Sequence, residues 1–193
     1  MKRYGRALQN WLVAHWVTGA LFMGVVLLAL TPLLAMSWEP PLLLIFLHLP
    51  GYMVHQVEEH WGDRFRTYIN EKVFGGIEAL TPGDVLWINL PGVWGVNIVA
   101  LYLAYFYDAG WALAAPYLML VNAFAHLVNA MQTQEYNPGL ATAVLIFLPL
   151  GLVSLYMAGG TPLQHGIGVA VALAIHALIG ISANRRAARV ART

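Results

Sequence analysis

Six apolar stretches divide the chain, and short polar or turn-forming segments separate them. Each is close to the ~20 residues that an α-helix needs to cross about 30 Å of hydrocarbon, so we expect transmembrane helices. The second stretch is short and contains Leu49-Pro50-Gly51, which predicts a kink or a locally opened backbone. The predicted spans are residues 11–36, 42–58, 85–107, 111–131, 140–157 and 163–182.

The basic residues predict the orientation of these spans. With six spans, all ten basic residues fall on one side of the membrane, which the positive-inside rule makes cytoplasmic. An odd number of spans would place the two basic termini on opposite sides. We therefore predict six spans with both termini in the cytoplasm, and a first span too long to be a cleaved signal peptide. The basic residues are Lys2, Arg3, Arg6, Arg64, Arg66, Lys72, Arg185, Arg186, Arg189 and Arg192.

Residues 63–80 form the one substantial loop, between spans two and three. Within it Phe65, Ile69, Val73 and Ile77 recur every four residues, with charged residues between them. This pattern predicts a helix that lies on the cytoplasmic membrane surface. Such a helix would serve as a connector or as a lid over a substrate path.

Composition agrees with a membrane protein and excludes several other classes. Hydrophobic residues make up 60% of the 193 residues and charged residues only 10%, against roughly a quarter charged in soluble domains. The absence of cysteine excludes disulfides and thiolate zinc sites. A net charge of +1 without a basic patch argues against nucleic-acid binding. We predict a single all-α integral membrane domain over residues 1–193, a six-transmembrane-helix bundle whose partner is the lipid bilayer.

The second span ends in "MVHQVEEHW", which places unusual polarity at the end of an apolar helix. At 100° per residue, Glu58 and Glu59 fall about 60° and 40° to either side of His55. His60 points roughly 140° away from His55 and is the weaker member of the group. One face of this span therefore offers an imidazole and two carboxylates.

Other spans present polar residues at the same depth. In span four Asn122, His126 and Asn129 share one helical face, and span six carries His176. With the predicted topology, these histidines, His55 and His15 of span one each lie ~7–10 Å inside the cytoplasmic boundary. Four spans would thus place a histidine in one layer.

A metal ion explains this layer better than separate hydrogen bonds do. A lone histidine or asparagine in a membrane helix can be explained by a hydrogen bond to a neighbouring helix. Two adjacent carboxylates repel each other unless one is protonated or a cation neutralises both. We expect a divalent cation, zinc with iron or manganese as alternatives, because these metals suit imidazole and carboxylate ligands. The predicted ligands are His55, His126, one of Glu58 and Glu59, and His176 as a further ligand.

The sequence also resembles a known family. "HQVEEH" matches the HXXEE motif that names a family of small bacterial membrane proteins, and "NAFAHLVN" and "EYNPGLATA" resemble its second and third blocks. The resemblance covers roughly residues 40–155. It implies a bacterial inner-membrane protein with a metal or catalytic site, and it implies no particular activity. For Tyr136 to Gly139 we favour a structural explanation, a turn that starts span five. The residues carried over are His55, Glu58, Glu59, His126, Asn129, Tyr136, Pro138 and Gly139.

These observations favour a metal-dependent membrane hydrolase that acts on a lipid-like or amphiphilic substrate from the cytoplasmic leaflet. The glutamate that does not bind the metal would act as general base on a water molecule. Asn129 or Asn122 would donate a hydrogen bond to the developing oxyanion.

Two other functions stay open at this point. A metal-free glutamate protease is similar to the CAAX-endopeptidase family, but that family has the spacing EExxxR and this chain has "EEHWGDR", one residue longer. A small transporter of metal ions or protons would also use intramembrane histidines and glutamates. The pattern leaves the substrate and the oligomeric state open.

Overall fold

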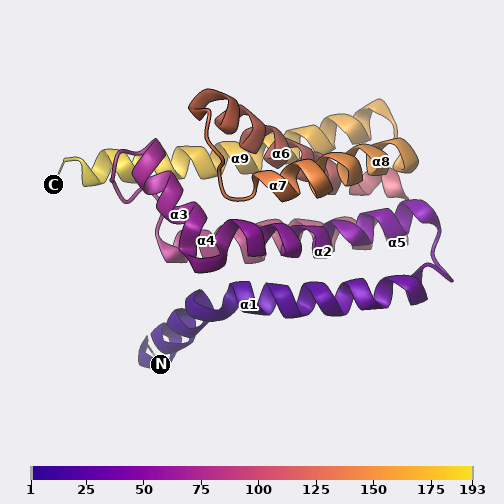
Figure 1. The fold of residues 1–193 in the computed structure, drawn as a ribbon. Coiled ribbons are helices and arrows are strands. Elements are labelled where there is room, and N and C mark those ends of the chain that lie inside the picture. The colour runs from indigo at the N-terminus through magenta and orange to yellow at the C-terminus, as the bar shows by residue number, and fades with distance from the viewer. Residues whose placement is uncertain (1, 193) are drawn as a thin grey trace.

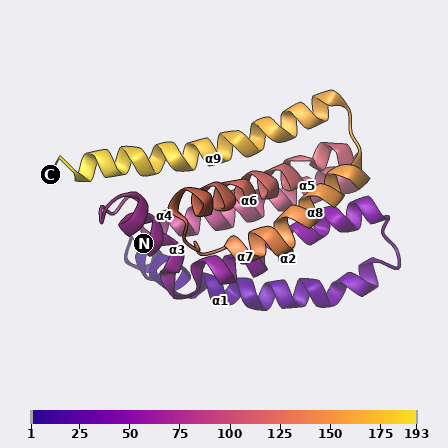
Figure 2. The ribbon, with the colours of Figure 1, turned by 45° about the horizontal axis from the view of Figure 1, so that its top comes forward.

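Long antiparallel helices run back and forth along one axis in the computed structural model, which describes residues 2–192. The N- and C-terminal ends lie at the same end of the bundle (Figure 1). A short helix, α3 (Arg64–Tyr68), lies at that end too (Figures 1 and 2). The long elements are α1 (Lys2–Leu34), α2 (Pro40–His60), α4 and α5 (Pro82–Trp87 and Gly95–Phe106), α6 (Ala114–Thr133), α7 and α8 (Leu140–Thr142 and Leu148–Ala158) and α9 (Pro162–Val190).

Five of these elements are long and apolar enough to cross a membrane. They are Ala7–Leu34, Pro82–Phe106, Ala109–Thr133, Leu140–Ala158 and Pro162–Val190. The multi-pass membrane protein is thereby confirmed, while the sixth span stays a prediction. Helix α2 differs because its polar residues lie inside the bundle: eleven of its 21 residues are buried, among them His48, His55 and Gln56.

Proline and threonine define where several helices begin. Pro82 and Pro162 lie at the first positions of α4 and α9, where a missing N–H costs nothing. Thr81 and Asp84 form a capping box before α4, as Thr161 and Gln164 do before α9. These reciprocal bonds satisfy N–H groups that a helix start leaves unpaired.

Two prolines inside helices are accommodated differently. Around Pro91 the chain forms a π-helical segment, Ile88–Trp94, that joins α4 to α5. Proline lacks the N–H of the regular ladder and its ring clashes with an earlier carbonyl, and a wider turn relieves both. Helix α2, by contrast, is continuous through Pro50, so the open backbone predicted at Leu49-Pro50-Gly51 does not occur. Gly51 instead allows close packing, because an added Cβ would lie 3.4 Å from side-chain atoms of Leu150 and Met119.

The predicted helix over residues 63–80 is only partly correct. It is α-helical over Arg64–Tyr68 and π-helical over Ile69–Val73, and then it ends. Gly75 and Gly76 follow with φ of +62° and +89°, a left-handed conformation that stops a helix and favours glycine. The remaining apolar residues of the segment, with Ile77 among them, pack on Ala183 and Ala187 of α9.

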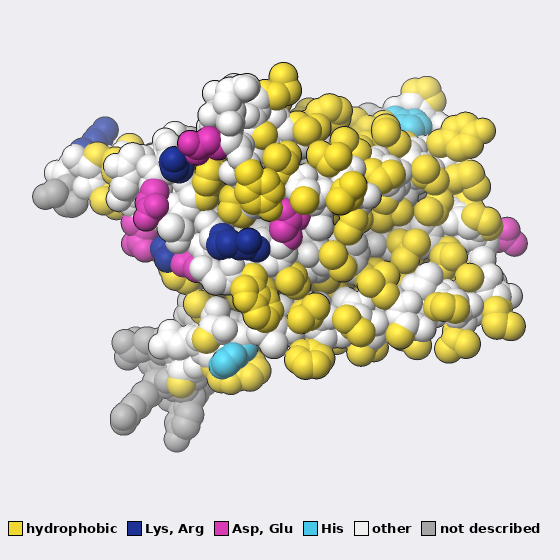
Figure 3. Space-filling model, viewed as in Figure 1, with side chains coloured by type: hydrophobic (Ala, Val, Ile, Leu, Met, Phe, Trp, Pro, Cys, Tyr) yellow, Lys and Arg dark blue, Asp and Glu magenta, His cyan; other side chains and the backbone are white. Residues whose placement is uncertain are grey.

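The surface has the polarity of a membrane protein. Acidic and basic side chains gather at the end that carries the termini, while hydrophobic side chains cover most of the rest of the face in view (Figure 3). Large side chains such as Phe22, Leu145 and Tyr156 are 70%, 74% and 85% exposed. Such exposure is unfavourable in water and suits a hydrocarbon environment.

Candidate metal centre

Three side chains converge between α2 and α6. His55 Nε2 and His126 Nε2 each lie 3.5 Å from a different oxygen of the Glu59 carboxylate, Oε2 and Oε1 respectively. One potential ligand atom from each residue lies within 4.8 Å of the others, and all three residues are buried. Donors ~2.0–2.2 Å from a tetrahedral zinc ion lie about 3.5 Å apart, so this spacing suits one ion. The structure therefore brings both predicted histidines together with Glu59, and Glu58 is not part of this cluster.

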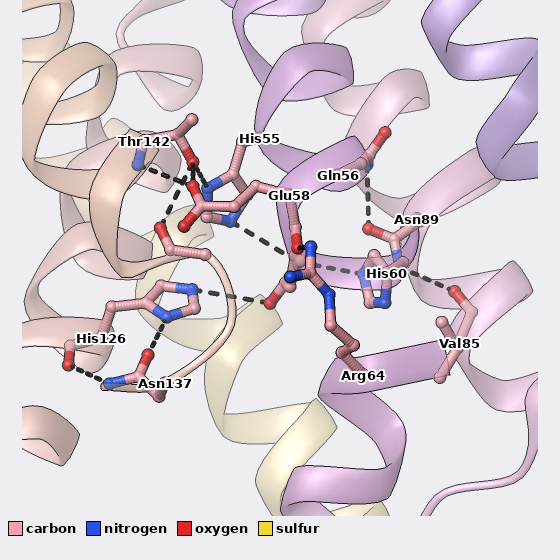
Figure 4. A network of polar contacts seen from close by, with 12 residues as sticks. His55, Gln56, Glu58, His60, Arg64, Val85, Asn89, His126, Asn137 and Thr142 are labelled. Carbon is pink, nitrogen blue, oxygen red and sulfur yellow. Dashed lines mark hydrogen bonds and ion pairs between the residues drawn. The ribbon is translucent and has the colours of Figure 1, made fainter. Parts of the chain in front are cut away.

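The side chain of Asn137 determines which nitrogen of His126 carries a proton. Asn137 Nδ2 donates to the backbone carbonyl oxygen of His126 over 2.9 Å, which turns Oδ1 towards the ring (Figure 4). Oδ1 lies 2.6 Å from His126 Nδ1 and can only accept, so Nδ1 carries the proton. In the neutral imidazole, Nε2 then holds a lone pair that faces Glu59.

Thr142 and Glu58 determine which nitrogen of His55 carries a proton. The Thr142 hydroxyl donates its single proton to Glu58 Oε2. The hydroxyl oxygen of Thr142 lies 2.8 Å from His55 Nδ1 and must therefore accept the Nδ1 proton (Figure 4). This leaves a lone pair on His55 Nε2, a buried atom for which the described residues provide no hydrogen-bond partner.

Glu58 is held by hydrogen bonds on the side away from the cluster. The backbone N–H groups of Ala141 and Thr142 donate to its two oxygens over 3.1 and 2.7 Å. The Tyr136 phenol donates as well, and partial burial together with the Glu58 carboxylate raises the pKa of that phenol. The carboxylate of Glu58 is thus an acceptor that orients the start of α7.

These protonation assignments test whether the residues fit a metal ion. Both Nε2 lone pairs point at an anionic carboxylate, an arrangement that is repulsive unless a proton or a cation lies between them. Each histidine also donates its other N–H to an oxygen, as metal-bound histidines generally do. The set of one carboxylate and two imidazoles therefore fits a divalent cation.

Gly139 brings the loop after α6 into contact with both rings. Its φ is +98°, and an added Cβ would lie 2.7 Å from His126 Cε1 and 2.8 Å from His55 Cε1. Only glycine combines this backbone conformation with this approach. The loop thereby closes one side of the cluster.

The cluster opens into a cavity of about 380 Å³. The cavity extends between α2, α3, α6 and α9, and most of its lining is apolar, including Phe65, Leu118 and Ile179. Glu59 is the single carboxylate among the described lining residues, and no lysine or arginine lines the cavity. An apolar pocket with a few converging polar groups is typical of ligand-binding sites.

His60 also contacts Glu59, which the helical projection did not predict. Its Nε2 lies 2.9 Å from Glu59 Oε2, and the residue lines the cavity. Helix α2 ends at this residue, whose φ and ψ are −110° and −6°, so a regular 100° step does not apply to it. Asn89 lies 3.2 Å from the same nitrogen and is held by Gln56, which in turn accepts from the indole of Trp94 (Figure 4).

Of the other predicted residues, three line the cavity and one lies outside it. Asn122, Asn129 and His176 line the cavity. His176 is not part of the three-residue cluster, and its Nδ1 donates to the Ala172 carbonyl oxygen over 2.9 Å. His15 lies outside the cavity, because its exposed ring packs against Trp11 with centroids 5.1 Å apart.

Sequence analysis did not identify Asn137 and Thr142 as residues of the site, and it ranked His60 as the weaker member of the group on α2. Asn137 and Thr142 lie within the segment "EYNPGLATA", so the family resemblance marked their neighbourhood without their roles. Thr142 acquires its role from Glu58, 84 positions away, and Asn137 acquires its role from His126, 11 positions away across the end of α6.

Comparison with known proteins agrees with the geometry. A family described as "Protein of unknown function with HXXEE motif" matches residues 46–154, more than half of the chain. No curated protein and no solved structure matches the chain. The matched region contains the two histidines and the glutamate of the cluster, together with Glu58, the loop of Asn137 and Gly139, and Thr142. The chain therefore belongs to the HXXEE family, for which no function is established.

Proposed function

We propose that this protein is a metal-dependent membrane hydrolase that acts on an amphiphilic, lipid-like substrate. One observation carries the proposal: His55, Glu59 and His126 converge, with both free lone pairs directed inward, on one side of an apolar cavity. Zinc is the expected metal, with iron or manganese as alternatives, because two imidazoles and a carboxylate with a position left open are typical of catalytic zinc sites.

Two residues near the cluster would take part in the reaction, one as proton acceptor and one as hydrogen-bond donor to the substrate. A zinc ion bound there would supply an activated water and polarise a substrate carbonyl. His176 donates from Nδ1 to a backbone carbonyl, so its Nε2 is free to accept a proton in the cavity. The Tyr68 hydroxyl donates to Asn129 Oδ1 over 2.7 Å, which leaves Asn129 Nδ2 to donate to the substrate carbonyl oxygen.

We assign Glu58 a positioning role. It does not line the cavity, and its hydrogen bonds hold Thr142, which in turn holds His55. Glu58 therefore acts through Thr142 on the orientation of a metal ligand, an effect that outer partners of metal sites commonly exert.

The position of the cavity supports access from the membrane. A groove of about 470 Å³ between α4 and α9 shares Leu80, Ile88, Ile179 and Ala183 with the cavity, and Arg186 lies at its rim. We propose that the substrate enters there, from the leaflet at the end of the bundle that carries both termini. With α2 as a sixth span, the positive-inside rule makes that end cytoplasmic, in a bacterial inner membrane.

The two alternative functions receive less support. A glutamate protease needs its arginine at the site, yet Arg64 is exposed and donates to the backbone carbonyl oxygens of Glu58 and Trp61. A transporter needs polar groups through the whole bundle. His48 and His165 instead pair locally with Ser154 and Tyr117, and neither lines the cavity.

Metal content of purified variants tests the proposal. We expect about one zinc ion per wild-type chain, near-complete loss in Glu59→Gln, and retention with roughly 10–100-fold weaker affinity in Glu58→Gln. Glu135→Gln is the matched control, because Glu135 is exposed and pairs only with Lys72 among the described residues. Hydrolysis of a lipid ester and amide panel should follow the metal content.

Two results would contradict the proposal. If wild-type protein supplied with zinc, iron or manganese retains none, or if Glu59→Gln retains as much as Glu135→Gln, the metalloenzyme assignment is incorrect.

A further inference from the structure

Two residues that line the cavity each carry a buried polar atom without a hydrogen-bond partner among the described residues. Tyr52 is only 2% exposed, and its hydroxyl is unpaired. The Oδ1 atom of Asn122 is also buried and unpaired. Both residues line the cavity that contains Glu59. Buried polar groups are almost always paired, so these two groups indicate where a ligand makes its polar contacts.

Other amide side chains of the cavity each make at least one hydrogen bond to a described residue. Asn137 is bonded to His126, Asn129 accepts from Tyr68, and Asn184 donates to a backbone carbonyl oxygen. Tyr52 and Asn122 thus differ from their neighbours. A hydroxyl can donate, whereas Oδ1 can only accept, so the ligand must offer one acceptor and one donor.

The charge of the lining argues against a phosphate as the polar end of the ligand. Sites that bind phosphate or transfer phosphoryl groups use arginine, lysine, metal ions or helix N-termini to neutralise several negative charges. No lysine or arginine lines this cavity among the described residues, and the Glu59 carboxylate would already offset half of the charge of a divalent cation bound there. An uncharged polar end is the better match.

The apolar lining describes the rest of the ligand. Ile69 and Phe74 follow α3, while Ile175 and Ile179 lie on α9, and all four line the cavity. A volume of about 380 Å³ is within the usual range for one small-molecule ligand, which suits a single alkyl chain better than a two-chain lipid.

We propose that the substrate is a single-chain fatty acyl amide. Its carbonyl oxygen accepts from the Tyr52 hydroxyl, and its N–H donates to Asn122 Oδ1. This inference rests on the proposed function for the reaction itself. Hydrolysis would add one water across the acyl C–N bond, release a fatty acid and an amine, and transfer a proton through His176 to the leaving nitrogen.

Binding of three matched ligands tests the inference. The probes are N-methyldodecanamide, methyl dodecanoate and dodecyl phosphate, titrated calorimetrically into the full-length protein in detergent micelles, with and without EDTA. We expect the amide to bind at least about tenfold more tightly than the ester, because the ester leaves Asn122 Oδ1 unpaired. The phosphate should bind more weakly than either.

Variants connect this preference to the two residues. Asn122→Leu should weaken amide binding about tenfold and leave ester binding unchanged. Tyr52→Phe should weaken amide and ester binding by a similar factor, because both ligands carry the carbonyl. Tyr117→Phe is the matched control, since the Tyr117 hydroxyl bonds to His165 outside this cavity.

The outcomes separate this inference from the proposed function. Equal binding of amide and ester by the wild type, tightest binding of the phosphate, or no binding of any probe would overturn the inference, whatever the zinc content. An amide preference in a protein that takes up no metal would support the ligand class and refute the metalloenzyme.

Discussion

Replacement of Gly139 by alanine tests the metal centre from the backbone side, without removing a ligand. The added Cβ has two separable effects. At φ +98° an L-residue is strained by roughly 1–3 kcal/mol. The Cβ would also lie 2.7 and 2.8 Å from the Cε1 atoms of His126 and His55. Overpacking of this kind typically costs about 1–3 kcal/mol.

Gly76 provides the control, because it isolates the first effect. Its φ is +89°, and an added Cβ would meet no atom within 4 Å. Gly76→Ala should therefore lower the free energy of unfolding by about 1–3 kcal/mol through strain alone. Gly139→Ala should lower it by about 2–6 kcal/mol, since strain and overpacking add.

Zinc affinity should differ more between Gly139→Ala and Gly76→Ala than stability does. The imidazole rings can relieve the contact only by moving apart, which displaces the Nε2 atoms from a shared ion. We expect Gly139→Ala to bind zinc roughly 10–100-fold more weakly, by analogy with other changes next to metal ligands, and Gly76→Ala to bind it as the wild type does. Competition with a calibrated chelator and thermal unfolding in detergent would measure both quantities. Equal zinc affinity and equal unfolding midpoints for the two variants would refute the inferred packing of Gly139 against the rings.

Two further predictions concern the amide that orients His126 and the topology of the chain. Asn137→Leu should weaken zinc binding about 10–100-fold, because His126 Nδ1 loses its hydrogen-bond acceptor. Asn184→Leu is the control, because Asn184 lines the same cavity but donates to a backbone carbonyl oxygen rather than to His126, and it should leave zinc affinity unchanged. Equal losses of affinity in both variants would contradict the role of Asn137 in orienting His126. Reporter fusions at the N-terminus, after Gly76 and at the C-terminus should all indicate the cytoplasm if α2 is a sixth span. A five-span chain would place the N-terminus on the opposite side from the other two fusions, and that result would exclude the six-span topology.

The sequence by itself determined the helical spans and the polar face of α2. Both follow from local patterns: hydrophobic stretches of membrane-spanning length, and residues three and four positions apart that share a helical face. The same reasoning placed His55 and His126 at matched depth, and the structure brings them together. Family resemblance marked the loop from Tyr136 to Gly139, although the sequence alone favoured a plain turn there.

Local patterns were insufficient wherever a helix ended. The apolar repeat from Phe65 to Ile77 predicted one helix, but Gly75 and Gly76 end it. His60 was projected away from the cluster, yet it contacts Glu59 because α2 ends there. A helical projection holds only while each residue keeps helical torsion angles.

Only the tertiary structure distinguished the two glutamates. Glu58 and Glu59 lie at similar angles from His55, so the helix gives no reason to prefer either as a ligand. Helix α7 makes the difference, because it brings the N–H groups of Ala141 and Thr142 to Glu58 and leaves Glu59 facing both imidazoles. Such contacts join positions more than 80 residues apart, and the packing of three helices determines them rather than any local preference of the chain.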